Sequence, residues 1–205
     1  MSSSEKIDEF VRRLSKRRNS TTVFNPYRNS SLADNLIVYL GYMLEQYNEP
    51  VLLVGEAPGY KGCRLTGIPF SSGTIIRSSE HKLFLDISPR IHLDKVESEN
   101  SATVVWENLM DVKNIPLFWN SFPFHPHPKK IQNKNRAPNK KELLEGLGFL
   151  AELIEIFQPK KMAGIGRKGT SALEMKFPDE QIVYIRHPSY GGKKDFVSGM
   201  EKILN

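Results

Sequence analysis

The sequence predicts an α/β protein, a three-layer α/β/α sandwich around a central, mainly parallel sheet of four strands. Three observations lead to this fold class. Four short runs are almost wholly apolar, longer stretches with helical spacing alternate with them, and the runs lack the apolar and polar alternation of a strand with one wet face. Strands that helices cover on both sides of a parallel sheet have this composition.

The four expected strands are VLLV, IPLFW, KMAGI and QIVYI, at residues 51–54, 115–119, 161–165 and 181–185. In an open parallel sheet, ligands bind where loops leave the carboxyl ends of the strands. The residues that follow each run are therefore the first candidates for a functional site.

The helix expected after Asn139 has the clearest pattern. Asn139 and Glu142 have the spacing of an N-terminal capping box, and Pro159 marks the end of the helix. Its apolar residues recur at spacings of four, three, four and three, which places them on one face: Leu143, Leu147, Leu150, Ile154 and Phe157.

Similar apolar faces predict helices before the first strand, at 36–47, and at the C-terminus, at 196–203. Shorter helices are expected after Ser72, after Lys168 and before Ile115. The stretch PRIHLDKVESENS, at 89–101, has the composition of a polar surface insertion.

The length and composition favour a single domain over residues 1–205, with an N-terminal helical segment at about 1–48. A chain of 205 residues can bury a substantial core, and no repeat or linker divides it.

The chain has 29 basic and 23 acidic residues, and the resulting net charge of +6 favours an anionic partner. No stretch has the length and apolarity of a signal peptide or a membrane span. We expect a soluble, cytoplasmic monomer with no membrane partner.

Cys63 is the only cysteine. One thiol permits no intrachain disulfide and no cluster that needs several thiolates, and it fits a reducing compartment. We expect neither a metal nor an organic cofactor.

The first strand exit is GEAPGYKGCRLTGIPF. Gly55, Pro58 and the glycine at 59 predict a tight turn that lets backbone approach a ligand, with the Glu56 carboxylate on it. Alternatively, Glu56 caps a turn or pairs with an arginine. Phe70 either closes the core or offers its ring to a planar ligand. The loop lacks the Gly-Lys-Ser/Thr ending of a phosphate loop and the spacing of a dinucleotide fingerprint.

The second exit is WNSFPFHPHP. Asn120 follows the apolar run directly, so its amide can present one donor and one acceptor at the strand tip, although asparagine also forms turns there. His125 and His127 suggest a metal, but the surrounding prolines favour a rigid surface loop and no third ligand is evident.

The last two exits add polar and basic groups. GIGRKGTSAL puts Arg167 and Lys168 at an expected helix start, where they suit a phosphate or simply cap the helix. IRHPSYGG puts Arg186, His187 and Ser189 at the fourth strand end, where the histidine is either a ligand-binding or a structural residue. Residues 129–141 contain six basic residues and no acid, a patch that suits a polyanion or a solvated surface.

Together, GEAPG, GIPF, the asparagine at the next strand tip and HPS resemble the ordered motifs of the uracil-DNA glycosylase superfamily, over about residues 51–199. The first motif is most similar to the Gly-Glu-Ala-Pro-Gly branch, a family-4-like group otherwise known for an iron-sulfur cluster. That branch normally supplies four cysteines to the cluster. This chain has one, so the resemblance does not extend to the cluster.

The resemblance implies a role for each matching residue. Glu56 would orient or activate water, His187 would face the carbonyl oxygen of the departing base, and Asn120 would bind the pyrimidine edge and reject cytosine. Phe70 would stack on the extruded base, beside the base-binding loop residues Gly55, Ala57 and Pro58. Ser189 and Tyr190 would lie in the loop that probes the DNA minor groove. Independently of the resemblance, the positive charges of Arg167, Lys168, Arg186 and the run at 129–141 are expected to hold DNA phosphates.

The expected function is hydrolysis of the N-glycosidic bond of uracil, or of a related deaminated base, in DNA. Ala57 departs from several other branches, which have Asp or Asn at this position to place the attacking water. This departure keeps open a catalytically silent nucleic-acid-binding module of the same fold. A hydrolase of free nucleosides is a third alternative, which the basic run at 129–141 disfavours.

Overall fold

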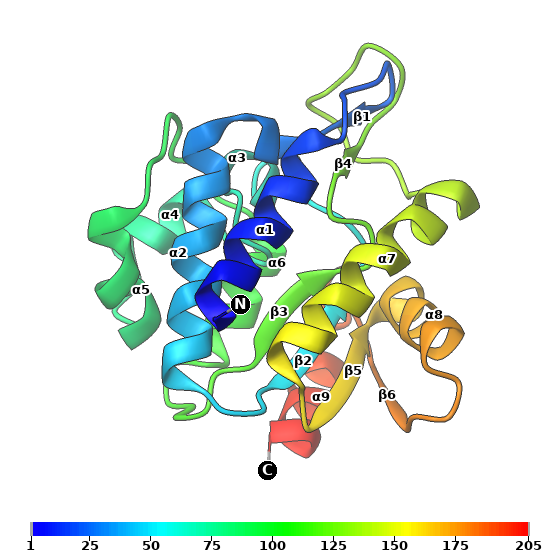
Figure 1. The fold of residues 1–205 in the computed structure, drawn as a ribbon. Coiled ribbons are helices and arrows are strands. Elements are labelled where there is room, and N and C mark those ends of the chain that lie inside the picture. The colour runs from blue at the N-terminus through cyan, green and yellow to red at the C-terminus, as the bar shows by residue number, and fades with distance from the viewer. Residues whose placement is uncertain (1, 205) are drawn as a thin grey trace.

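The computed structural model describes residues 2–204 and confirms the predicted fold class. Figure 1 shows a central sheet with helices on both sides. All neighbouring strands of the sheet are parallel, and their order is β3-β2-β5-β6. The strands are β2 (Val51–Gly55), β3 (Leu117–Asn120), β5 (Lys161–Ile165) and β6 (Ile182–Ile185).

The expected strand at 161–165 is identical to β5, and the other three differ from the observed strands by one or two residues at their ends. The second strand begins at Leu117 instead of residue 115, because Pro116 has no backbone N–H to give to a ladder. The first strand extends to Gly55, which pairs with Asn120 at the end of the neighbouring strand.

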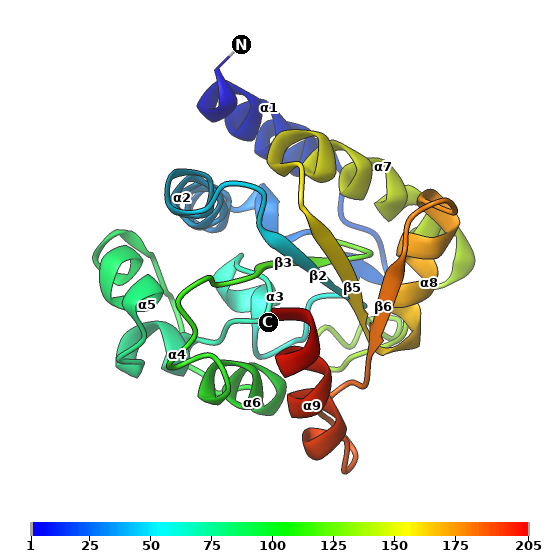
Figure 2. The same cartoon turned by 90° about the horizontal axis from the view of Figure 1, so that it is seen from below.

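Helices form the two outer layers, which Figure 2 shows with the sheet between them. One layer contains α1 (Ser3–Lys16), α7 (Lys140–Phe157) and α8 (Gly166–Lys176). The other contains α6 (Asn100–Glu107) and α9 (Lys193–Leu204). Shorter elements connect these layers: β1 (Val23–Phe24), η1 (Pro26–Arg28), α3 (Cys63–Thr66), α4 (Gly73–Ser78), α5 (Lys82–Ile87), η2 (Ser88–Arg90) and β4 (His125–Pro126).

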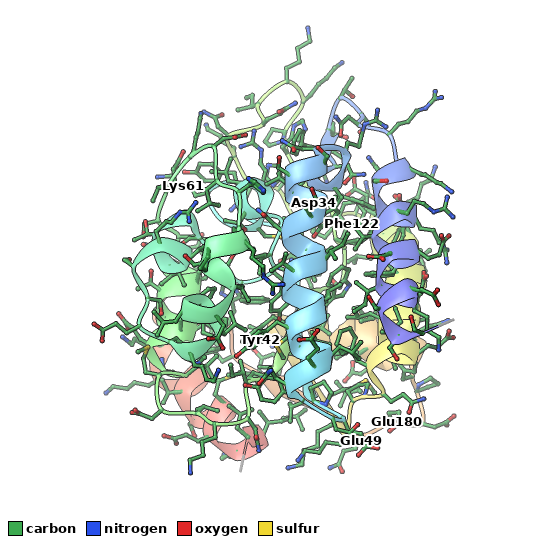
Figure 3. The ribbon with its side chains drawn as sticks, turned by 60° about the vertical axis from the view of Figure 1, so that its left-hand side comes forward. Asp34, Tyr42, Glu49, Lys61, Phe122 and Glu180 are labelled. Carbon is green, nitrogen blue, oxygen red and sulfur yellow. The ribbon has the colours of Figure 1, made fainter. Side chains whose placement is uncertain are left out.

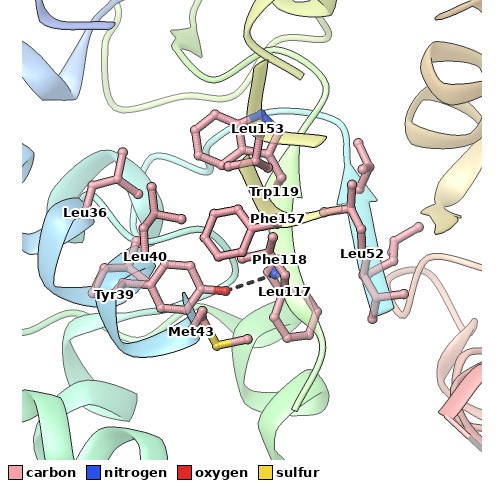
Figure 4. Packing of buried hydrophobic residues seen from close by; sticks show 14 of the residues in the cluster. Leu36, Tyr39, Leu40, Met43, Leu52, Leu117, Phe118, Trp119, Leu153 and Phe157 are labelled. Carbon is pink, nitrogen blue, oxygen red and sulfur yellow. Dashed lines mark hydrogen bonds between the residues drawn. The ribbon is translucent and has the colours of Figure 1, made fainter. Parts of the chain in front are cut away.

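Helix α2 (Ser30–Gln46) covers the outer edge of β3. The N–H of Phe118 donates to the hydroxyl oxygen of Tyr39 over 2.9 Å, inside the apolar cluster that Figure 4 shows. An edge strand leaves such groups unpaired, and a side chain from a covering helix satisfies this one. Tyr39, Phe118 and the adjacent Trp119 are all buried.

The same buried side of α2 also contacts the segment that follows β2. Tyr42, labelled in Figure 3, donates its hydroxyl to Oδ2 of Asp86 on α5 over 3.0 Å. The side-chain amide of Asn35 donates to the carbonyl oxygens of Thr66 and His92. These bonds fasten the long β2–β3 connection to the N-terminal helices.

The predicted capping box of α7 is present. The Asn139 side chain accepts from the N–H of Glu142, and the Glu142 carboxylate accepts from the N–H of Asn139. The same carboxylate receives two 2.8 Å bonds from Arg136, which ties the preceding loop to the helix.

The expectation of a surface loop around the two histidines is wrong. His125 and His127 are buried: β4 pairs with β1, and the His125 ring lies between the carbonyl oxygens of Pro58 and Gln132. Nδ1 of His125 lies 2.8 Å from the carbonyl oxygen of Pro58, so the ring supports the loop after β2. Within residues 2–204, no three His, Cys, Asp or Glu side chains are grouped so that they could hold a metal ion.

The expected surface insertion at 89–101 is also partly wrong. Ile91 is buried, and the N–H of His92 donates to Asn35 Oδ1 over 2.9 Å. Near the end of the segment, the Glu99 side chain lies against the loop after β2 instead of pointing into solvent. Among the described residues, no helix combines the length and apolarity that crossing a membrane requires.

Candidate active site

The register of the sheet brings the four strand exits together. Gly55 pairs with Asn120, and Ile165 pairs with Ile185, so the strands end nearly level at one edge. A pocket of about 560 Å³ opens at this edge. It is lined by every predicted site residue except Gly55: Glu56, Ala57, Pro58, Phe70, Asn120, Arg167, Lys168, Arg186, His187, Ser189 and Tyr190.

Gly55 lies directly beneath the pocket. A Cβ atom on this residue would lie 2.4 Å from Cζ of Phe70 and 3.2 Å from Oδ1 of Asn120. Only a residue without a side chain leaves room for the ring and the amide at these positions.

Phe70 both packs on the core and borders the pocket. Its ring lies 5.1 Å from that of Phe118, at an interplanar angle of 37°. Its backbone has a φ of 53°, an uncommon value for a bulky residue, and its carbonyl oxygen accepts from Nε1 of Trp106 over 2.8 Å. Phe70 therefore packs on the core and also lines the pocket, and a role of its ring in binding a ligand stays a prediction.

Glu56 neither caps a turn nor pairs with an arginine among the described residues. Its Oε1 atom is buried and has no hydrogen-bond partner. Burial raises the pKa of the carboxyl group, and the positive charge of Lys168 partly opposes this shift. A buried polar atom without a partner is uncommon in folded proteins, and a catalytic role is one reason why a protein keeps such an atom.

The loop that holds Glu56 is fixed by the residues after β3. The Glu56 carbonyl oxygen accepts from the N–H of Phe122 over 3.1 Å and from the hydroxyl of Ser121 over 2.9 Å. The N–H of Ser121 donates to the carbonyl oxygen of Gly55 over 2.9 Å. These bonds fix the backbone of the Glu56 loop relative to the neighbouring Asn120, a residue that is only 5% exposed.

The first turn of α8 carries the two predicted phosphate-binding residues. The helix begins at Gly166, and Arg167 and Lys168 are exposed at the pocket. A Cβ atom on Gly169 would lie 2.0 Å from the carbonyl oxygen of Val54. This glycine lets the start of α8 rest on the end of β2, which brings the Lys168 charge near Glu56.

His187 has a defined hydrogen-bonding role. Its Nδ1 atom accepts from the N–H of Ser189 over 3.2 Å, so the neutral ring carries its proton on Nε2. Burial lowers the pKa of the ring, and the charge of Arg186 lowers it further. At neutral pH the imidazole is therefore an uncharged N–H donor at the pocket.

Tyr190 and the basic residues form the rim. Tyr190 is completely exposed and has a φ of 52°. In the basic run at 129–141, the five lysines are exposed, but Arg136 is held by Glu142. The predicted patch therefore contains one fewer available cation, because this arginine ties its loop to α7.

Several lining residues were not predicted from the sequence. Glu99 and Ser101 come from the segment expected as a surface insertion, and Tyr184 is a half-exposed residue of edge strand β6. No local pattern distinguishes Glu99 from the exposed acids around it. Cys63 also lines the pocket, but it is buried and its pKa is raised to about 12, which keeps the thiol protonated.

Fold and site together define an α/β protein with a ligand pocket at the carboxyl edge of its sheet. The family model of the uracil DNA glycosylase superfamily matches residues 43–201. The chain belongs to this superfamily, which confirms the resemblance of its motifs. Its branch within the superfamily stays a prediction.

A solved structure, described as that of wild-type SMUG2 from Pedobacter heparinus, is similar over nearly the whole molecule. The TM-score is 0.64 and the sequence identity is 16%, with 98% of this chain and 96% of that chain covered. At this identity the likeness shows a shared fold. A comparison with curated proteins gave no match.

Proposed function

We propose that this protein is a DNA glycosylase that hydrolyses the N-glycosidic bond of uracil, or of a related deaminated base, flipped out of DNA. One observation carries the proposal. The unpartnered Glu56 carboxylate opens into the same pocket as the Phe70 ring, the Asn120 amide and the His187 imidazole. These are the groups needed to bind a flat base and to support opposite charges on sugar and base.

Base binding begins with extrusion, because the glycosidic bond is inaccessible within a duplex. Flipping costs a few kcal/mol. Stacking on an aromatic ring is worth roughly 1–3 kcal/mol per base, so Phe70 offsets much of this cost. The exposed Tyr190 ring is placed to fill the gap that the base leaves.

Asn120 selects the base. Its amide offers one donor N–H group and one acceptor oxygen to the edge of a pyrimidine. Uracil presents N3–H and O4, which match these groups, whereas cytosine presents N3 and an amino group, which reverse them. A wrong base leaves the nearly buried amide unpaired.

In the bond-breaking step, the sugar becomes cation-like and the base departs as an anion. The Glu56 carboxylate stabilises the cation and holds the water that adds to C1′, as carboxylates do in glycoside hydrolysis. The Nε2–H of His187 donates to the oxygen on which the base charge develops. Loss of one such donor typically costs about 3–4 kcal/mol of barrier. The water supplies its hydroxyl group to the sugar and its proton to the departing base.

Ala57 has no polar side chain to place the water, so this work falls to Glu56 alone. DNA is the proposed partner, held at its phosphates by Arg167, Lys168 and Arg186, with the protein acting as a monomer. The exposed positions of these three side chains around the pocket support this assignment.

The test is cleavage of a uracil-containing oligonucleotide, with alkali used to break the abasic sites. We expect the wild type to release uracil and Glu56→Gln to lose at least about a hundredfold in rate, in line with the size of general-base contributions. Asn120→Ala should also be severely impaired. Glu174→Gln, on the exposed side of α8, is the matched control.

Three results would change the assignment. Equal cutting by Glu56→Gln, Asn120→Ala and wild type would mean that the activity resides elsewhere. Salt-sensitive DNA binding without release of any damaged base would favour the silent binding module. Hydrolysis of free nucleosides, without DNA, would favour the nucleoside hydrolase.

A further inference from the structure

One wall of the pocket comes from a segment outside the four strand exits. Glu99, directly before α6, lines the pocket beside Ser101. Its backbone is fixed, because the Glu99 carbonyl oxygen accepts from the N–H of Thr103 over 3.0 Å. The side chain points back toward the loop that follows β2.

Two glycines of that loop make room for the carboxylate. A Cβ atom on Gly62 would lie 1.5 Å from Oε2 of Glu99, and one on Gly59 would lie 2.6 Å from Oε1. The Glu99 carboxylate therefore occupies the space in which a side chain of the loop would otherwise lie. The carbonyl oxygen of Ser71, next to Phe70, would lie 2.7 Å from the same Cβ atom on Gly62. The Glu99 carboxylate therefore lies close to the segment that holds Phe70.

A hydrogen bond, and no ion pair among the described residues, holds the Glu99 carboxylate at the pocket. The Ser101 hydroxyl donates to Oε1 over 2.8 Å, and the described residues include no cation in an ion pair with this carboxylate. Burial raises the pKa of Glu99, which the bond from Ser101 partly opposes. Neutralising a neighbouring charge does not account for the position of this side chain.

We propose that Glu99 is a specificity-determining residue that closes the pocket against bases substituted at C5. The inference rests on the proposed function. With Phe70 beneath the ring, and Asn120 and His187 on the edge that carries N3 and the carbonyl oxygens, we assign the C5–C6 edge to the wall that Gly59 and Glu99 line.

Uracil has only a hydrogen atom at C5, whereas thymine has a methyl group. A methyl group at this wall would collide with the Glu99 carboxylate or bury it without supplying a hydrogen bond, which is unfavourable. Glu99, the side chain that we propose limits the width of the pocket, is 37 positions after Gly62, the glycine that it covers.

The experiment compares Glu99→Ala with Glu99→Gln, which keeps the size of the side chain. Oligonucleotides carry uracil, 5-fluorouracil, thymine or 5-hydroxymethyluracil in one sequence context, a series graded by the size of the C5 group. We expect the thymine-to-uracil ratio of kcat/KM to rise at least about tenfold in Glu99→Ala. Discrimination for or against one methyl group in a pocket is usually about 10- to 200-fold in kcat/KM. Glu99→Gln should keep the wild-type ratio.

Glu97→Ala is the matched control, because Glu97 lies outside the pocket and its nearest cation, Lys61, is 3.9 Å away. It should leave all ratios unchanged. A Glu99→Ala ratio equal to that of the wild type would overturn the proposal. If Glu99→Ala does not fold, Glu99→Asp, which withdraws the carboxylate by one carbon, should still raise the ratio.

A binding measurement separates this proposal from the proposed function. The wild type and Glu99→Ala are titrated with free uracil and free thymine in a calorimeter. The affinities show whether Glu99 excludes the C5 methyl group, and no cleavage is needed. Thymine should bind only to Glu99→Ala, whereas uracil should bind to both. If this binding pattern is found but no oligonucleotide is cleaved, only the proposed glycosylase activity is refuted. If neither protein binds either base, the proposed role of Glu99 in excluding C5 substituents is refuted as well.

Discussion

Glu56 and His187 are both partly buried at the pocket, and burial opposes the charged form of each. For Glu56 this raises the pKa, and for His187 it lowers the pKa. The proposed reaction needs the Glu56 carboxylate and the neutral His187 ring, which are the deprotonated forms of both groups. The shift at His187 thus favours the active form, and the shift at Glu56 opposes it.

The pH profile should show an acid limb. As the pH falls, Glu56 gains a proton at a pH above the ordinary glutamate value of about 4.3, and His187 gains one below the ordinary histidine value of about 6.5. We therefore expect kcat/KM on a uracil oligonucleotide to be full near neutral pH and to fall on acidification, beginning at a pH above the ordinary glutamate value. Activity that increases toward acid pH would contradict the assigned protonation states.

The contact between Gly55 and Phe70 gives a second prediction. A methyl group at 55 overlaps the ring, so Gly55→Ala should displace it and lower kcat/KM at least about tenfold, the loss of one stacking contact. Gly41→Ala, which meets nothing within 4 Å, should have no effect on kcat/KM.

A double-mutant cycle tests whether the loss runs through the ring. In a Phe70→Ala background, Gly55→Ala should cost little more, because the overlapping atoms are gone. Full additivity of the two substitutions would show that Gly55 acts by another route, such as its contact with Asn120.

At the scale of single elements, α7 contains two glycines with different surroundings. A Cβ atom on Gly146 would lie 1.9 Å from the carbonyl oxygen of Ser121, just beyond β3, whereas Gly148 meets nothing within 4 Å. The close approach at Gly146 seats the helix against the segment that fixes the Glu56 loop.

We expect Gly146→Ala to destabilise the protein by about 1–3 kcal/mol, the usual range for overpacking. Gly148→Ala, in the same helix, should stabilise it by about 0.5–1 kcal/mol, because it removes only the entropic cost of a helical glycine. Urea denaturation measures both. Equal effects of the two substitutions would show that the helix does not approach the end of β3 closely at Gly146.

At the scale of the whole molecule, the net charge of +6 is concentrated in part around the pocket. Arg167, Lys168 and Arg186 are exposed at its rim, and the middle of the basic run at 129–141 lines it through Asn135, Arg136 and Ala137. A surface of this kind binds polyanions through the release of counterions.

DNA affinity should therefore fall linearly on a plot of log K against log salt. Each of Arg167→Ala and Lys168→Ala should reduce the slope by about 0.9 for duplex DNA, or about 0.7 for single strands. Lys202→Ala, on α9 and away from the pocket, should leave the slope unchanged. Equal slopes for all four proteins would place the DNA elsewhere.

Local sequence was sufficient for the sheet and for most of the site. Apolar runs predict strands buried on both faces, and the carboxyl ends of parallel strands meet at one edge, so Glu56, Asn120, Arg167 and His187 could be placed together. Sequence was least reliable for segments whose burial depends on distant partners. His125 has proline neighbours, which suggest a surface loop, yet β1 and the Pro58 carbonyl group bury it.

The class of fold, the four strand exits and their polar residues follow from the amino-acid sequence, because periodicity and turn chemistry act over a few neighbouring residues. Three features depend on the packed molecule: Glu99 fills the space over Gly62, Arg136 forms an ion pair with Glu142, and Gly146 approaches another segment whereas Gly148 does not. Each of these contacts depends on how separate segments pack, which no local pattern encodes.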